Sequence, residues 1–430
     1  MRALARGEEP DWPGLTGEQE SGLLATADTY LDLYRKHHLP EGLNADILWE
    51  DYHRSSVIKY DGLGDSTTWT GHYLAVLALR YHILREEATR GEILDVLDRF
   101  DLLTRVSGRT GYLARYAGRA DNPAYEEYYR VYGGRESRER PGLGVRAYWG
   151  AGEYAHMVWL GHSSRDTYDG ARLGFAVVWV YVDDPEIRAR TRQLVERIGD
   201  RLVRDNWKIL DGQGSHTWHS FRWKLAWMRL LLSVSPERYA PLQEAYDRMV
   251  LRFPRSGPSI PGKRTRKYYP ANLNFARMFV LATLEDDPEK RDRFHTAIRR
   301  AYHEKAGDHL NAHFAALYMA ATGDIHNANA RATLEGMLCD YPPPPKWARV
   351  VDHRRRPGTA MRDADFTKHA LLTREQVPRD FLWQRPPCLA YGGVDKPLEY
   401  PALDFILPYW LGRVCGALSD PTKTLEPSGH

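Results

Sequence analysis

The stretch at residues 162–204, HSSRDTYDGARLGFAVVWVYVDDPEIRARTRQLVERIGDRLVR, contains the pattern that decides the fold. Polar and aromatic residues at its start open an apolar run over residues 166–182, and a charged, amphipathic run follows over residues 185–204. Both runs have the period of an α-helix, and the Asp183-Asp184-Pro185 turn between them places a proline where helices often begin. The stretch therefore predicts a helical hairpin with an apolar inner helix and an amphipathic outer helix.

The same alternation recurs along the chain, and Asp-Asp-Pro recurs at residues 286–288. We predict about twelve helices and an all-α fold. Polar and aromatic clusters open the inner helices at residues 65–72, 162–168, 216–219, 268–274, 308–313 and 400–404. The predicted inner helices cover residues 67–84, 166–182, 221–234, 271–285, 309–322 and 403–418. The predicted outer helices cover residues 21–37, 91–105, 185–204, 236–251, 288–305 and 327–339.

Two long segments do not follow the helical pattern. Residues 106–161 are rich in Gly, Tyr and Arg, and short alternating runs at residues 128–132 and 146–149 predict strands and loop there. Residues 341–401 contain many prolines, which exclude a long helix. We predict an N-terminal arm (1–17), one helical domain (18–418) that contains the insertion (106–161) and the extended loop (341–401), and a C-terminal tail (419–430).

The composition excludes several classes of protein. The 60 basic and 57 acidic residues leave a net charge of +3, and they form no long block of one sign that would favour nucleic acid or a membrane surface. No apolar run reaches the roughly 18 residues of a membrane span, so we expect a soluble protein, cytoplasmic unless a signal peptide has been removed. Three cysteines without metal-ligand spacing predict free thiols. We expect a small-molecule or oligosaccharide substrate, no metal and no cofactor, and a homo-oligomer stays open.

This alternation resembles the (α/α)6 toroid of the six-hairpin glycosidase-like superfamily, which also includes polysaccharide lyases and sugar epimerases. The resemblance covers roughly residues 18–418 and depends on the helix order, because the chain has no diagnostic catalytic motif of that superfamily. It implies a ring of six inner helices inside six outer ones. It also implies a carbohydrate-active enzyme with its active site in a cleft at one end of the inner ring, where the polar clusters would meet.

The first two clusters supply the candidate catalytic residues. Asp65 stands at the start of an inner helix, at the N-cap position, and Trp69 and His72 follow about one turn deeper. We predict that they provide an acid, an aromatic platform and a hydrogen-bonding group for a sugar. The cluster at residues 162–170 is the strongest, because burying its charges would be costly unless they pair or bind a ligand. We assign it these candidates: His162 and Tyr168 as catalytic groups, Asp166 as the principal acid/base, and Arg165 as a substrate-binding group.

The remaining clusters supply candidate substrate-binding residues. His216 and His219 are close enough in sequence to approach one metal if helical, but hydrogen bonding to substrate is the preferred interpretation. Asp308 is predicted as an N-cap, with His309 and His313 on one helix face. Asn272 and Asn274 lie on different helix faces, so one at most is expected to reach a ligand. The candidates from these clusters are His216, Trp218, His219, Asn272, His309, His313 and Asp404.

The sequence leaves four functions open. A glycoside hydrolase needs two carboxylates, one acting as acid and one as base or nucleophile. A polysaccharide lyase or sugar epimerase would instead use Tyr, His and Arg to hold a uronate and abstract its α-proton. A hydro-lyase, isomerase or cyclase would act on an apolar, terpenoid-like molecule in an aromatic cavity. A non-enzymatic scaffold of helical hairpins is the fourth alternative. The hydrolase is the preferred prediction.

Overall fold

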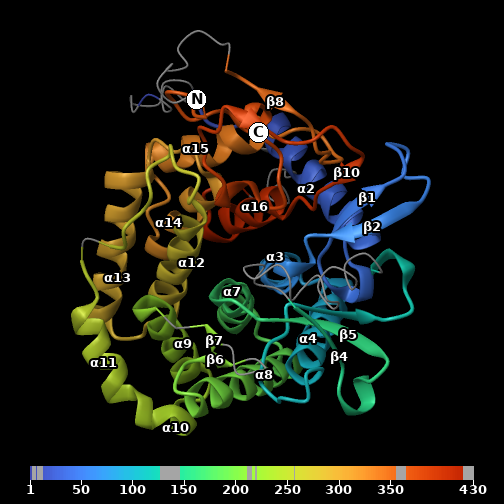
Figure 1. The fold of residues 1–430 in the computed structure, drawn as a ribbon. Coiled ribbons are helices and arrows are strands. Elements are labelled where there is room, and N and C mark those ends of the chain that lie inside the picture. Colours follow the sequence, from blue (N-terminus) through green and yellow to red (C-terminus); the bar gives the residue numbers. More distant parts are fainter. Residues whose placement is uncertain are drawn as a thin grey trace, which may run out of the picture. The chain divides into compact units, whose positions relative to one another are not determined.

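The computed structural model describes residues 1, 6, 13–125, 146–210, 216–217, 220–255, 257–354 and 365–419. These residues are mostly helical with small antiparallel sheets, which confirms the all-α class (Figure 1). The chain divides into two compact units. One unit joins Met1–Lys36 to Pro254–His430, and we name it the terminal unit; the other, His37–Phe253, is named the central unit. None of the described helices has the length and apolar character needed to cross a membrane.

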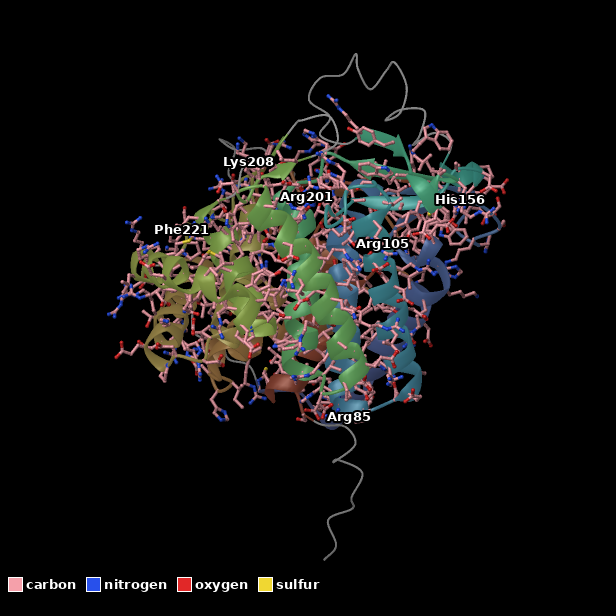
Figure 2. All side chains as sticks on the ribbon, turned by 90° about the horizontal axis from the view of Figure 1, so that it is seen from below. Arg85, Arg105, His156, Arg201, Lys208 and Phe221 are labelled. Atoms are coloured by element: carbon pink, nitrogen blue, oxygen red, sulfur yellow. The ribbon has the colours of Figure 1, made fainter. Side chains whose placement is uncertain are left out.

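The central unit contains the first three predicted inner helices, α3 (Ser66–Leu84), α7 (Arg165–Tyr181) and α9 (Phe221–Val234). The outer helices α4 (Glu87–Arg105) and α8 (Pro185–Arg204) alternate with them, so that α4 packs on α3 and α8, and α8 packs on α7 and α9. In Figure 2, Arg85 at the end of α3 lies at one end of this unit. Arg105 and Arg201, near the ends of α4 and α8, lie toward the other end with Phe221, where α9 starts.

Three glycines allow α3 and α7 to pack in backbone contact. A Cβ atom added at Gly71 would lie 2.2 Å from the carbonyl oxygen of Gly170, and one added at Gly170 would lie 2.3 Å from that of Thr68. A Cβ atom at Gly174 would lie 2.6 Å from the carbonyl oxygen of Gly71. Since no side chain fits between the helices at these points, α3 and α7 form one rigid pair.

Small sheets and turns complete the central unit. Strand β5 (Met157–Gly161) pairs antiparallel with β3 (Tyr116–Arg119) on one side and β4 (Arg146–Trp149) on the other. Strand β4 confirms the strand predicted at residues 146–149, whereas the strand predicted at 128–132 lies outside the described residues. The other strands are β1 (Asp46–Trp49), β2 (Val57–Asp61), β6 (Ile209–Leu210) and β7 (His216–Thr217); the 3₁₀ turns are η1 (Pro40–Gly42), η2 (Leu63–Asp65), η3 (Pro123–Tyr125) and η4 (Gly152–Tyr154).

The terminal unit contains the other inner helices, α12 (Tyr269–Leu284), α14 (Ala312–Thr322) and α16 (Leu403–Cys415). Helix α14 packs against both α12 and α16, and the outer helices α13 (Pro288–Ala301) and α15 (Ala328–Cys339) pack beside them (Figure 1). Helix α2 (Gly17–His37) contacts α16 through the rings of Tyr30 and Phe405. The three cysteines Cys339, Cys388 and Cys415 are free thiols, as predicted.

Residues 341–401 contain no long helix in their described part, as the prolines predicted. Short elements interrupt the loop instead: β8 (Val351–Asp352), η7 (Thr373–Glu375), η8 (Leu382–Gln384), β9 (Tyr391–Gly392) and β10 (Leu398–Glu399). Strands β8 and β9 pair antiparallel. Buried aromatic side chains such as Phe381 and Trp383 anchor the loop to the core.

The two Asp-Asp-Pro turns have the same local structure. Asp184 caps α8 by accepting a hydrogen bond from the Ile187 N–H at 2.9 Å, and Asp287 caps α13 by accepting from the Glu289 N–H at 3.0 Å. In both turns an arginine donates from Nε to the carbonyl oxygen of the residue that directly follows the inner helix, six positions before the arginine. These bonds are Arg188 to Val182 and Arg291 to Glu285, each at 2.7 Å. The turns therefore form equivalent hairpins in the two units.

Helices α2 and α4 each begin four residues before the predicted start, and α16 ends three residues before the predicted end. Three further predicted helices differ from the structure. The one at residues 236–251 divides into α10 (Pro236–Tyr239), the 3₁₀ turn η5 (Ala240–Leu242) and α11 (Gln243–Arg252), because Pro241 cannot donate a backbone hydrogen bond. The one at 288–305 ends at Ala301 and continues as the π-helical turn η6 (Tyr302–Ala306). The one at 309–322 starts at Ala312.

We predict that Gly71→Ala destabilises the protein by about 2–3 kcal/mol, because its methyl group would overlap the backbone of α7. The matched control is Gly91→Ala in α4, where nothing lies within 4 Å of the added methyl group. That control should raise stability by about 0.5–1 kcal/mol through its higher helix propensity. Urea unfolding followed by circular dichroism measures both, and equal midpoints for the two variants would contradict the close contact of α3 and α7.

Candidate functional site

Three of the predicted polar clusters meet at the starts of α3 and α7 in the central unit. Arg115 donates from Nη1 to the carbonyl oxygen of Gly64 at 2.6 Å and from Nε to that of His162 at 3.1 Å. The same guanidinium lies 3.7 Å from Oδ1 of Asp65. From β7, the Thr217 hydroxyl donates to the carbonyl oxygen of Ser163 at 3.2 Å. We name the group Asp65, Arg115, His162, Arg165 and Asp166 the α3–α7 rim.

The loop that enters α7 is held in a strained conformation. His162 has a φ of +55°, in the left-handed region that non-glycine residues rarely adopt. The next residue is fixed from both sides: the Ser163 N–H donates to the Tyr112 hydroxyl at 2.9 Å, and its own hydroxyl donates to the Leu113 carbonyl at 2.6 Å. Backbone strain that the surrounding contacts maintain in this way is characteristic of functional sites.

Four of the five side chains of the α3–α7 rim are at least partly exposed, whereas Arg115 is buried. His162, Arg165 and Asp166 are half-buried, and the Asp65 side chain is 49% exposed. Asp65 occupies the predicted N-cap position, but its carboxylate makes no capping hydrogen bond and faces Arg115 instead. The carbonyl oxygen of Arg165 accepts a hydrogen bond from the Trp223 indole at 3.2 Å, which fixes the first turn of α7 against α9. The rim thus combines solvent access with a rigid backbone.

A buried polar group lies one turn deeper in the same helices. The rings of Trp69 and His72 pack at a centroid distance of 4.9 Å, as their spacing on α3 predicted. His72 Nδ1 donates to the carbonyl oxygen of Thr68 at 2.8 Å, and burial lowers the pKa of His72 to about 4, against the attraction of the nearby Asp169 carboxylate. Asp169 itself forms an ion pair with Arg172 at 2.5 Å, and both side chains are buried. His72 is therefore neutral at pH 7.

Tyr168 is a packing residue in this structure. Its hydroxyl oxygen accepts a hydrogen bond from the Leu113 N–H at 3.0 Å, and its ring contacts Trp223 and Trp227. Burial raises the pKa of Tyr168, so the phenol stays neutral. Because its hydroxyl already binds the backbone and its ring is packed between tryptophans, we assign Tyr168 a structural role.

The terminal unit has a separate Tyr–His pair near the starts of α12 and α14. The Tyr268 hydroxyl lies 2.8 Å from His309 Nδ1, and His309 Nε2 lies 3.9 Å from Oδ1 of Asp308. Lys263 forms an ion pair with the same Asp308 carboxylate. Burial lowers the pKa of His309 to about 4 and raises that of Tyr268, so both groups are neutral at pH 7. We name this group the Tyr268–His309 pair.

The predicted role of Asp308 as an N-cap is wrong, and so is the shared helix face of His309 and His313. Asn311 caps α14 by accepting from the Phe314 N–H at 3.0 Å. His309 therefore lies before the helix, and Leu310 between them has a φ of +50°. His313 is instead buried on α14, with its ring 5.3 Å from that of Phe381.

The two asparagines of α12 differ as their spacing predicted. Asn274 accepts a hydrogen bond from Arg277 Nη1 at 3.3 Å and donates to the carbonyl oxygen of Ser259 at 3.4 Å. Asn272 is 2% exposed, and its buried Oδ1 has no hydrogen-bond partner among the described residues. An unbonded buried carbonyl costs free energy, so Asn272 is the better candidate for a ligand contact.

Asp404 holds the Pro-rich loop rather than facing solvent. Its fully buried carboxylate accepts from the Tyr341 hydroxyl at 2.7 Å, from Lys346 Nζ at 2.5 Å and from the Leu382 N–H at 2.7 Å. Burial raises the pKa of Asp404, and these three donors oppose that effect. Since three donors already occupy its oxygens, we assign Asp404 a structural role.

The third cluster is described only in part. His216 and Thr217 form strand β7, so they are not helical, and Trp218 and His219 lie outside the described residues. Among the residues that the structure does describe, no three His, Cys, Asp or Glu side chains gather in a way that could hold a metal ion.

The sequence alone did not identify several residues of these sites. Arg115 lies in an irregular segment, and no local pattern distinguishes it from the many other arginines. Asp169 and Arg172 did carry a signal: they are opposite charges three residues apart inside an apolar helix, a spacing that brings side chains together. Tyr268 and Lys263 pair with residues far along the chain, and sequence spacing says nothing about such contacts.

Comparisons of the chain with protein-family models, with curated proteins and with solved structures find no match.

We predict that removal of Lys346 strongly destabilises the terminal unit, because it leaves the Asp404 charge buried without its cation. Breaking a buried ion pair in this way costs about 3–5 kcal/mol. Lys346→Met is compared with Lys396→Met, whose side chain is exposed and should matter little. Thermal and urea unfolding measure both variants. A Lys346→Met midpoint equal to that of the control would show that Asp404 does not depend on this cation.

We also predict that His309 contributes to stability in a pH-dependent way. Its folded pKa of about 4 lies below the usual value near 6.5, so its contribution is complete above pH 6.5 and is lost as the pH falls toward 4. His309→Gln should therefore reduce the loss of stability between pH 6.5 and 4.5 by about 2 kcal/mol. Urea unfolding at several pH values measures this slope. The exposed His326→Gln is the control, and parallel slopes for the two variants would contradict the burial of His309.

Proposed function

We propose that the chain is a carbohydrate-active enzyme that cleaves a glycan at the α3–α7 rim, as a glycoside hydrolase using acid/base catalysis. One observation carries the proposal: Arg115 binds the carbonyl groups of Gly64 and His162, and so ties together the starts of α3 and α7, where the partly exposed carboxylates Asp65 and Asp166 stand in the sequence. Glycoside hydrolysis requires two carboxyl groups that flank one bond, and this rim supplies two.

The two carboxyl groups have different roles in this proposal. Asp65 lies 3.7 Å from the Arg115 guanidinium, and we assign it the role of base or nucleophile. Asp166 at the first turn of α7 then acts as the acid that protonates the leaving oxygen. In this proposal Arg165 and His162 bind sugar hydroxyls. Trp69 and His72 form the floor beneath the rim.

The wider architecture we propose is the (α/α)6 toroid. Each unit contains three inner helices with outer partners, and the Asp-Asp-Pro turns of the two units share the same hydrogen bonds.

A polysaccharide lyase or sugar epimerase is the second candidate, favoured by the Tyr268–His309 pair. The hydrogen bond of 2.8 Å joins two neutral groups, one able to accept a proton and one able to donate it. In this reaction His309 takes the proton α to a uronate carboxylate, and Lys263 lies close enough to Asp308 to bring a positive charge to the pair. For elimination, Tyr268 then protonates the leaving sugar oxygen.

The test is turnover of a panel of neutral and uronate oligosaccharides with product analysis. Hydrolysis yields a new reducing end with oxygen from water, whereas elimination yields an unsaturated uronate that absorbs ultraviolet light. On a hydrolysed substrate, Asp166→Asn should lower kcat by at least about 100-fold. The control Asp286→Asn changes an exposed turn residue and should retain full activity.

Full activity of Asp166→Asn would refute the assignment of the acid. An unsaturated product whose formation is abolished by Tyr268→Phe, but not by Asp166→Asn, would move the function to the lyase. Binding or turnover restricted to apolar compounds would exclude both carbohydrate activities.

A further inference from the structure

A small cavity in the Pro-rich loop of the terminal unit lies apart from both candidate sites. Its volume is about 130 Å³, and its walls include Tyr341, Lys346, Trp347, Arg349 and Gln376. None of the residues around it belongs to the α3–α7 rim or to the Tyr268–His309 pair. It is therefore a separate feature that the proposed reaction does not use.

The polar hydroxyl groups around the cavity are already bound to the protein. Tyr341 donates to the Asp404 carboxylate at 2.7 Å, and Thr373 donates to the carbonyl oxygen of Met337 at 2.8 Å. The cation Lys346 is likewise neutralised by Asp404. These groups stabilise the wall and are not available to a ligand without breaking existing bonds.

Among these polar groups Arg349 is the exception, because part of its guanidinium makes no hydrogen bond to a described residue. Its Nη2 donates to the carbonyl oxygens of Arg374, at 2.5 Å, and Gln376, at 3.1 Å, while Nε and Nη1 make no hydrogen bond to a described residue. No described carboxylate forms an ion pair with it, although it is half-buried and burial lowers its pKa. A partly desolvated cation without an anion is unfavourable, so an anion that binds Nε or Nη1 would relieve this cost.

The remaining walls suit an apolar ring. Trp347 contributes an aromatic face, and Pro342, Pro345 and Pro378 contribute rigid apolar ones. An apolar cavity of about 150 Å³ in another protein accepts benzene, so this volume has room for a single six-membered ring and little more. Size and charge together therefore select a ligand with one ring and one carboxylate.

We propose that this cavity binds a small carboxylic acid with a single aromatic ring, of the benzoate class. The carboxylate accepts a hydrogen bond from Nη1 of Arg349 and lies beside its charge, and the ring packs against Trp347 and the prolines. Binding involves no covalent step, and it would stiffen the loop at residues 341–382 by joining Arg349 to the opposite wall.

The experiment measures binding of benzoate and of benzyl alcohol, its neutral counterpart, to the full chain by isothermal titration calorimetry at constant pH and ionic strength. Benzoate should bind at least about tenfold more tightly than benzyl alcohol, because only the acid reaches the guanidinium with a charge. Arg349→Met should weaken benzoate binding at least about tenfold and leave benzyl alcohol unchanged, whereas Arg300→Met on the exposed face of α13 should change neither.

Equal affinities of the two compounds for the native protein, or no binding of either, would overturn the proposal. Unchanged benzoate binding to Arg349→Met would overturn it as well. If Arg349→Met fails to fold, Trp347→Ala provides the second variant and should weaken both compounds, so an unchanged benzoate affinity there would also refute the site. Glycan turnover is measured in parallel, because Arg349 lies outside the catalytic residues: loss of benzoate binding with full turnover leaves the proposed function intact.

Discussion

The buried carboxylate of Asp404 is the interaction on which the terminal unit depends. Residues 341–401 contain little regular secondary structure, so few backbone ladders hold them in place. Asp404, on the first turn of α16, accepts hydrogen bonds from Tyr341, Lys346 and the Leu382 backbone, which are distant from one another along the loop. Burying this charge is costly, and it is tolerated because each oxygen has a donor. The same contacts fix the walls of the cavity next to Arg349, so the shape of that cavity follows from a single carboxylate.

The central unit depends on contact between backbones instead of charges. Gly71, Gly170 and Gly174 bring α3 and α7 together without intervening side chains, and this sets the separation of the two helix starts. Arg115 then binds both starts, to the carbonyl groups of Gly64 and His162. The helix pair thus determines the positions of Asp65 and Asp166, as the proposed acid/base reaction would require.

Local signals predicted a large part of this fold. Helices α8 and α9 begin and end at the predicted residues, because Pro185 with the Asp184 cap and the Ser220 cap act within a few residues of each helix start. The start of α14 was wrong because Asp308 and Asn311 both have capping side chains, and tertiary contacts decide between them: Asp308 is engaged by Lys263. The polar clusters were recognisable, but Arg115, which joins two of them, and the partners of Asp404 could not be predicted. Their contacts connect residues far apart in the chain.

The repeated Asp-Asp-Pro turn allows the sequences of the two hairpins to be aligned. When Asp183 is aligned with Asp286, Asp169 of α7 falls on Asn272 of α12, and Arg172 falls on Phe275. Asp169 and Asn272 have nearly the same shape and are equally buried. The acid has a cationic partner in Arg172, whereas Phe275 stands at the corresponding position of α12. The two inner helices thus share a hairpin register but differ in charge at this buried position, where α7 carries an ion pair and α12 a neutral amide.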